Sequence, residues 1–314
     1  MGLKIIENTI KAVSVLAVTA FLSCSRTEYD IRGGQPIRFS TNEVVTKSGS
    51  YFSAGDKIGV FAYYLPGGLW DGTAMPDFMY NVPLTLDNSE KWDYSPQMYW
   101  PSMTENQIRF YSYYPYLGML DEGELSISEA KAPGSPVLGF NMTDGKTDFL
   151  VSEPLQMSRP DMGEEVELPL KHSLGKVQFK FSVSSSGGFS FINAVKLYGI
   201  ASKGILKWNE SDEFFWETDG TFDLTIPSAG KDGFRVNDTE LTLADEFTSY
   251  ILPGAITHLG IFQNGVEKKY ELSSVAAITG RVLVFTFKVS LSGVTIDSEI
   301  VPWVDGGTSI GGIR

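Results

Sequence analysis

The chain has 314 residues, of which 38 are acidic and 25 basic, giving a formal net charge of −13 at pH 7. This balance and the lack of a basic cluster argue against nucleic acid as a partner. A single cysteine excludes a disulfide framework and a zinc ribbon. The chain is 42% hydrophobic, so packed apolar surface is available for two ordinary cores and must supply the stability.

The N-terminus has the pattern of an export signal. Lys4 and Lys11 precede the apolar run Ala12–Leu22, which is too short to cross a bilayer as a helix but is typical of a signal-peptide core. The run ends at Ser23-Cys24, which resembles a bacterial lipobox. We therefore expect residues 1–23 to be a lipoprotein signal peptide and Cys24 to carry the lipid; an ordinary cleaved signal peptide is the alternative.

Residues 24–35 are polar, contain Gly33-Gly34 and show no periodicity, so they are predicted to be a tether. After Pro36 the pattern becomes β. Ile37, Phe39 and Thr41 alternate with polar residues, which predicts a first strand. Further along, the stretches 57–64 and 108–116 predict two more strands, the second one rich in tyrosine.

The second half of the chain alternates more regularly between apolar and polar residues. Period-two alternation predicts strands that are buried on one face, as in antiparallel sandwiches. The apolar members are Val166, Leu168, Leu170, Val177, Phe179, Phe181, Val183, Phe222, Leu224, Ile226, Leu283, Phe285, Phe287, Val289 and Leu291. Asn264-Gly265 predicts a two-residue hairpin turn.

No long amphipathic helix and no tandem repeat occurs in the sequence, so an all-β fold is predicted. A Pro/Gly/acid-rich break near residues 158–165 suggests two β-sandwich domains, 36–170 and 171–314. The second would include a C-terminal strand and a Gly-rich tail.

The sequence offers little catalytic chemistry. His172 and His258 are the two histidines, and no nucleophile, phosphate-loop or metalloprotease motif is present. We interpret both histidines as structural. The carboxylates are scattered, so a two-carboxylate glycosidase is a distant alternative. The acidic stretch 209–219 lacks the spacing of a calcium loop, and no metal or cofactor is predicted.

Aromatic residues cluster around Trp92, Tyr94, Tyr99 and Trp100. Exposed rings of this kind could stack on sugar faces and form a glycan-binding platform. The favoured interpretation is that they fill the core, because they fall inside or beside strand patterns.

Several strings resemble the Bacteroidales fimbrillin family, and they follow one another in the family's order over nearly the whole chain. They are AGDKIGVF (54–61), YWP (99–101), FYSYYPY (110–116), DFLV (148–151), LPLKHSLGKV (168–177), ILPG (251–254) and IVPWVDGG (300–307). The resemblance implies two tandem transthyretin-like antiparallel β-sandwich domains, export to the outer membrane as a lipoprotein, and assembly into type V fimbriae.

In polymerising members of that family, a trypsin-like protease removes the tether and the first strand, and a neighbour's C-terminal strand fills the groove. Carried onto this chain, the removable strand would be residues 37–45, with Ile37, Phe39 and Thr41 as its inward residues. The donor strand would be residues 294–304, with Val294, Ile296, Ser298 and Ile300 on one face. The alternative is that both are ordinary intramolecular strands.

The chain departs from the family at the processing position. Where relatives often have an arginine after the first strand, this chain has Thr46-Lys47-Ser48. Either Lys47 is the cleaved residue, or this subunit keeps its first strand and anchor.

These patterns predict a structural or adhesive subunit of surface fimbriae rather than an enzyme. Its expected partners are other fimbrial subunits, the outer membrane through the lipid on Cys24, and a host or bacterial surface ligand. A glycan-binding surface lipoprotein is the alternative function.

Overall fold

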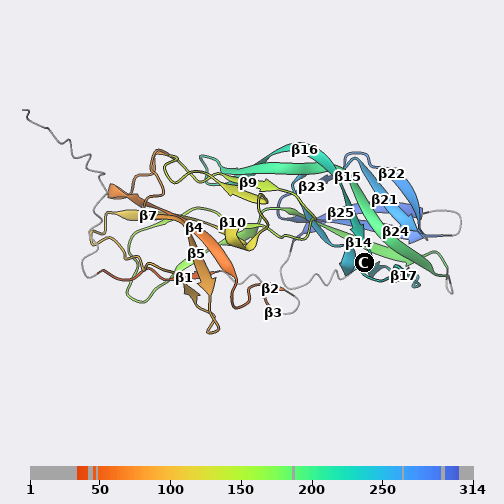
Figure 1. Cartoon of the computed structure of the whole chain (residues 1–314), viewed down its shortest axis with the longest axis horizontal. Coiled ribbons are helices and arrows are strands. Elements are labelled where there is room, and N and C mark those ends of the chain that lie inside the picture. The colour runs from red at the N-terminus through yellow and green to blue at the C-terminus, as the bar shows by residue number, and fades with distance from the viewer. Residues whose placement is uncertain are drawn as a thin grey trace, which may run out of the picture. The chain divides into compact units, whose positions relative to one another are not determined.

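The computed structural model describes residues 34–41, 45–46, 49–185, 188–263, 265–290 and 294–303. Within these residues the regular structure is strands and three short 3-10 turns, η1 (Pro66–Gly68), η2 (Leu117–Met119) and η3 (Asp245–Phe247). The predicted all-β fold is confirmed (Figure 1). The described part contains no helix that is long and apolar enough to span a membrane.

The largest sheet has nine strands in the order β12-β1-β6-β5-β4-β7-β10-β13, with β11 also paired to β7. Its strands are β1 (Phe39–Thr41), β4 (Lys57–Leu65), β5 (Met79–Leu86), β6 (Trp92–Asp93), β7 (Gln107–Tyr114), β10 (Leu150–Ser152), β11 (Leu155–Met157), β12 (Val166–Leu168) and β13 (Leu170–His172). The first and last parts of the N-terminal half therefore meet at one margin, where β1 pairs with β12.

A seven-stranded sheet has the order β22-β21-β15-β9-β8, and β16 and β17 also pair with β15. Its strands are β8 (Leu125–Ile127), β9 (Leu138–Asn141), β15 (Ser190–Trp208), β16 (Phe214–Pro227), β17 (Phe234–Val236), β21 (His258–Gln263) and β22 (Val266–Glu271). The hairpin of β21 and β22 confirms the turn predicted around residue 265, where Gly265 has a φ of 79°.

A five-stranded sheet has the order β18-β14-β24-β25, with β19 also paired to β14. Its strands are β14 (Gly175–Val183), β18 (Thr242–Leu243), β19 (Ser249–Ile251), β24 (Arg281–Val289) and β25 (Val294–Pro302). Two small ladders complete the described fold: β2 (Val45–Thr46) with β3 (Gly49–Ser50), and β20 (Gly254–Ala255) with β23 (Ala276–Ala277).

The alternating residues of β14 and β24 form a buried stack of phenylalanines. Phe179 lies opposite Phe285, and Phe181 lies opposite Phe287, with near-parallel rings. All four side chains are fully buried. The period-two pattern thus identified inward positions correctly in these strands; Leu291, predicted to continue it, lies outside the described residues.

Two strand pairs depart from the antiparallel pattern that the sequence suggested. β1 runs parallel to β12, and β14 runs parallel to β24. Parallel neighbours need a long crossover, and here each pair is separated by more than 90 residues of chain. Alternation reports which face of a strand is buried but carries no information about the direction of its partner.

The long β15–β16 hairpin links strands from both halves of the sequence. The C-terminal part of β15 pairs with β9, where Leu206 lies opposite Leu138. The N-terminal part of β15 pairs with β21 (Figure 1). The boundary near Leu170 stays a prediction.

Candidate functional site

The predicted removable strand occupies an interior place in the nine-stranded sheet. β1 pairs with β12 on one side, where Phe39 lies opposite Val166, and with Trp92 of β6 on the other. The residues just before it are bonded as well: Ile37 N donates to Met98 O at 2.9 Å. Removing this segment would leave unpaired backbone groups on both flanking strands, and such groups are costly to leave without partners.

The side chains of the first strand are anchors of the core. Ile37 is 0% and Phe39 3% exposed, and Thr41 is half-buried. The Phe39 ring makes edge contacts with Tyr94 at 5.4 Å and Phe110 at 5.6 Å between centroids. Loss of the strand would therefore open an apolar slot lined by aromatic rings.

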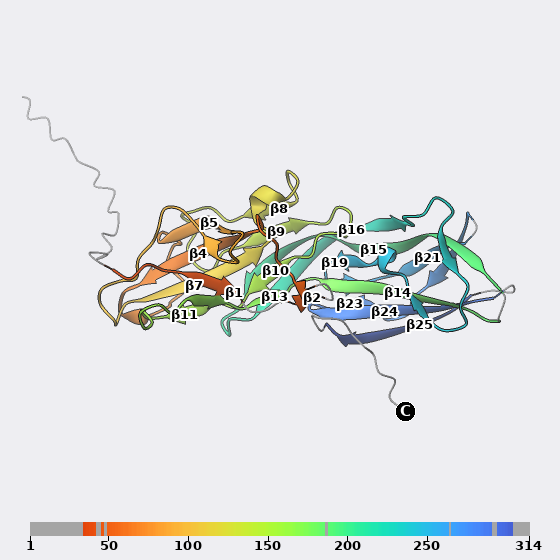
Figure 2. The same ribbon diagram turned by 90° about the horizontal axis from the view of Figure 1, so that it is seen from below.

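The predicted donor strand has the opposite placement. β25 pairs with β24 along its whole length and ends the order of its sheet among the described strands (Figure 2). Val294 and Ile296 are half-buried against the core, whereas Ser298 is exposed and Ile300 is 48% exposed. Among the described strands, β25 thus has a ladder partner on one edge only, and its apolar row is only partly covered.

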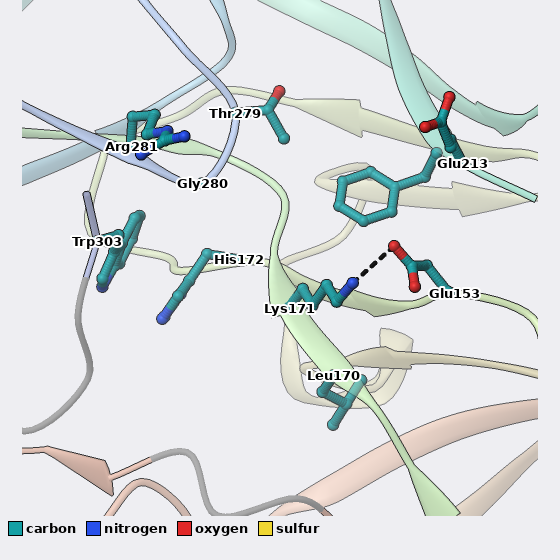
Figure 3. Close-up of a pocket in the computed structure, with 10 residues that line it drawn as sticks. Glu153, Leu170, Lys171, His172, Glu213, Thr279, Gly280, Arg281 and Trp303 are labelled. Atoms are coloured by element: carbon teal, nitrogen blue, oxygen red, sulfur yellow. Dashed lines mark hydrogen bonds and ion pairs between the residues drawn. The ribbon is translucent and has the colours of Figure 1, made fainter. Parts of the chain in front are cut away.

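The end of β25 is held by aromatic stacking. The Trp303 ring lies 3.6 Å from the His172 ring at an interplanar angle of 12°, and 5.7 Å from the Tyr250 ring at 14°. Figure 3 shows the indole facing the imidazole beside a pocket of about 610 Å³, which Lys171 and Arg281 also line. Lys171 forms an ion pair with Glu153 at 2.6 Å, so the charge of this lysine is already compensated.

His172 is itself positioned by a buried carboxylate. Its Nδ1 lies 2.9 Å from Asp148 Oδ2, and both side chains are 7% exposed. The Tyr51 hydroxyl donates to the same oxygen at 3.0 Å. Burial, followed by the charge of Asp148, raises the pKa of Tyr51, so this phenol stays protonated and acts as a donor.

The structural interpretation of the histidines agrees with this geometry. The His172 ring lies beside the buried carboxylate of Asp148 and is stacked on the Trp303 indole. His258 begins β21 in a different sheet, with its Nδ1 3.2 Å from the Thr257 hydroxyl. Among the described residues, no cluster of three or more metal-ligating His, Cys, Asp or Glu side chains occurs.

The aromatic cluster around residues 92–100 is mostly packed inward. Trp100 is 0% and Trp92 8% exposed, so neither indole presents a face to solvent. Tyr94 donates its hydroxyl to Ile37 O at 2.9 Å, and burial raises its pKa to about 12. These rings line the place of the first strand and do not form the exposed platform considered for glycan binding.

Sequence reasoning missed the connections among Tyr51, Asp148, His172 and Trp303. Three of these residues lie inside the family-like strings DFLV, LPLKHSLGKV and IVPWVDGG, which was the available signal. The lipidation position Cys24 and the processing position Lys47 lie outside the described residues.

These features define a class: an all-β protein with one strand inserted inside a sheet and another at the margin of a sheet, as far as the described strands go. Solved structures share the fold, with low sequence identity. A fimbrial protein from Bacteroides vulgatus aligns with a TM-score of 0.65 and 17% identity, over 86% of this chain and 100% of that one. Two proteins described as a "putative cell adhesion protein" also align. The one from Bacteroides uniformis has a TM-score of 0.55 and 16% identity, over 87% of this chain and 100% of that one. The one from Bacteroides ovatus has a TM-score of 0.54 and 16% identity, over 86% of this chain and 98% of that one.

The family itself is shown by sequence. The fimbrillin-like family model matches residues 43–303, which is most of the chain, and the protein belongs to that family. The resemblance inferred from the strings is thereby confirmed. No curated protein matches the chain.

Proposed function

We propose that this protein is a structural or adhesive subunit of cell-surface fimbriae and that its subunits join by β-strand donation. Family membership supports a fimbrial or adhesive role at the cell surface. The observation that supports this mechanism is that one chain contains both a place that could accept a strand and a strand that could be donated. β1 fills an interior place that becomes an apolar slot when emptied, whereas β25 lies last in its sheet among the described strands and has a partly uncovered apolar row.

The physical logic is β-augmentation. A strand from a second copy or another subunit would restore the ladder hydrogen bonds of β12 and β6, while its side chains fill the pockets of Ile37 and Phe39. The donor and acceptor surfaces differ, so the contact does not close on itself and repeated contacts produce a filament.

Trypsin treatment of the purified protein is expected to produce ladders that resist SDS, and deletion of residues 294–314 is expected to abolish them. Deletion of 304–314 alone keeps β25 and serves as the matched control. Ile300→Asp should also reduce the ladders while leaving the subunit folded, because a residue that is 48% exposed contributes little to monomer stability. Ladders that persist without residues 294–314 would contradict strand donation.

Mass spectrometry of the N-terminus of cell-surface material is expected to separate two roles in the fimbria. A chain that starts at a lipidated Cys24 would be an anchored subunit that keeps its first strand. A chain that starts at Ser48 would have been processed after Lys47 and would be an acceptor in the shaft. A mature chain that starts after Tyr51 would fit neither the anchored subunit nor the subunit processed after Lys47, and would contradict both assignments.

The alternative functions gain no support from the described site. A glycan-binding lipoprotein would need exposed rings, and the two candidate indoles are buried. A two-carboxylate glycosidase would need paired acids at one place, and the buried carboxylate described beside His172 is the single Asp148.

A further inference from the structure

The side-chain anchorage of β25 is concentrated at its ends. Val294 and Ile296 pack partly against the core at the start, and the middle of the strand, Asp297 to Glu299, is exposed. At the far end Trp303 stacks on His172 and Tyr250. Lys176 Nζ adds a cation above the indole, 5.3 Å from its centroid. The aromatic contacts therefore hold the end of the strand to residues from other strands.

A chain of contacts connects this end to Tyr51, the residue that follows the small β2–β3 ladder. Trp303 packs on His172, His172 lies 2.9 Å from Asp148, and Asp148 accepts the hydrogen bond of Tyr51. Oδ2 of Asp148 makes both contacts, and its buried Oδ1 has no hydrogen-bond partner among the described residues. The orientation of this carboxylate, against which the His172 ring lies, therefore depends on the hydrogen bond from Tyr51.

Tyr51 follows directly on β3 and lies four residues after Lys47, the predicted processing position. Its ring also packs edge-on against Phe52 and Tyr114, with centroids 5.2 and 5.8 Å away. A change in the backbone just before Tyr51 would therefore act on the hydroxyl that orients Asp148. No other described residue both borders the predicted cut and contacts this carboxylate through a hydrogen bond.

We propose that Tyr51, Asp148, His172, Tyr250 and Trp303 form a latch that holds the end of β25 on its own subunit. The latch is released when the segment before Tyr51 is cut or displaced. The inference deepens the proposed function and rests on it, since a latch on β25 matters most if that strand is donated. His172 and Tyr51 are positioning residues in this scheme.

The surroundings of Trp303 suit a contact that opens. A pocket of about 610 Å³ is lined by both Trp303 and His172 (Figure 3). The phenylalanines of β14 and β24 do not line this pocket, so the indole can leave without displacing them. The partner surface that it leaves, His172 and Tyr250, stays in place on β13 and β19. An unlatched strand would then be retained by its ladder with β24 and by Val294 and Ile296.

Hydrogen exchange of the monomeric, uncut full chain, followed by mass spectrometry, tests the latch. In Trp303→Ala, amides of residues 294–302 are expected to exchange on the order of tenfold faster, because two stacking contacts are lost. Trp303→Phe should restore most of the protection. Tyr51→Phe keeps the ring and loses one hydrogen bond, so it should speed exchange in the same strand by a smaller factor.

Phe189→Ala is the matched control, because Phe189 is 61% exposed and its ring packs on Phe191 of β15 and Arg235 of β17 rather than on the latch residues, so it should leave the exchange of residues 294–302 unchanged. Unchanged exchange of β25 in Trp303→Ala would overturn the latch. Faster exchange shared equally by β22 would report general loosening and would also overturn it. If Tyr51→Phe affects only residues near position 51, the link to the processing segment is wrong.

The outcome is separable from the test of strand donation. Faster exchange in Trp303→Ala without any ladders after trypsin would establish the latch and contradict the proposed function. Ladders that form at the wild-type rate together with unchanged exchange would support strand donation and overturn the latch. The latch and strand donation are both supported if Trp303→Ala speeds hydrogen exchange in β25 and also speeds ladder formation after trypsin treatment.

Discussion

Phe39→Ala is expected to lower the free energy of unfolding by about 3–5 kcal/mol, the usual cost of removing a buried phenylalanine ring. Phe39 is 3% exposed and contacts the rings of Tyr94 and Phe110, and its strand is paired on both sides. The cavity would lie against one face of the nine-stranded sheet, between the rings of Tyr94 and Phe110. The strands on both sides of β1 are held by ladder hydrogen bonds, so the backbone cannot move in to close the gap. Chemical denaturation followed by tryptophan fluorescence measures the change.

Phe189→Ala provides the comparison, because it removes the same ring from a position that is 61% exposed. It is expected to change the free energy of unfolding by less than about 0.5 kcal/mol. If Phe39→Ala also costs under about 1 kcal/mol, the first strand is not an anchor of the core. In that case its removal would not create the apolar slot on which strand acceptance depends.

Arg109→Ala is expected to cost about 3 kcal/mol, because it removes hydrogen bonds made by a buried charge. Arg109 lies on β7, is 4% exposed, and its Nε donates to the Tyr111 hydroxyl at 2.9 Å. Its guanidinium also packs 4.7 Å from the centroid of the Trp70 ring. Through Nη2 it pairs with Asp212 in the turn between β15 and β16, so it fastens the long hairpin to the nine-stranded sheet.

Asp212→Asn isolates the charge at the exposed end of this pair. Asp212 has a φ of 67°, a conformation that asparagine also tolerates, so the turn should be retained. Its side chain is 45% exposed, and the expected loss is therefore below about 1 kcal/mol. A double-mutant cycle with Arg109→Ala gives the coupling energy. Equal costs for both single variants would show that Arg109 acts through Asp212 alone and not through burial with Tyr111 and Trp70.

The latch and the Arg109 contact were beyond prediction because each joins residues that are far apart in the chain. Arg109 and Asp212 are 103 positions apart, and Tyr51 and Asp148 are 97 apart. His172 could be interpreted as a packed, bonded residue from its place beside an alternating strand. Which carboxylate lies beside His172 depends on how β10 and β13 pair. Backbone hydrogen bonds between two strands cannot be inferred from the sequence of either strand.

The sequence by itself determined the all-β class, the inward faces of strands such as β14 and β24, the β21–β22 hairpin and the fimbrillin-like family. Those features depend on local alternation, on turn chemistry, or on short strings that can be recognised one at a time. Only the tertiary structure decided that β1 lies inside a sheet, parallel to β12, and that β25 lies at a margin with its end stacked on His172. The reason is that strand order is chosen by the packing of the whole chain, since every strand offers the same backbone donors and acceptors to any neighbour.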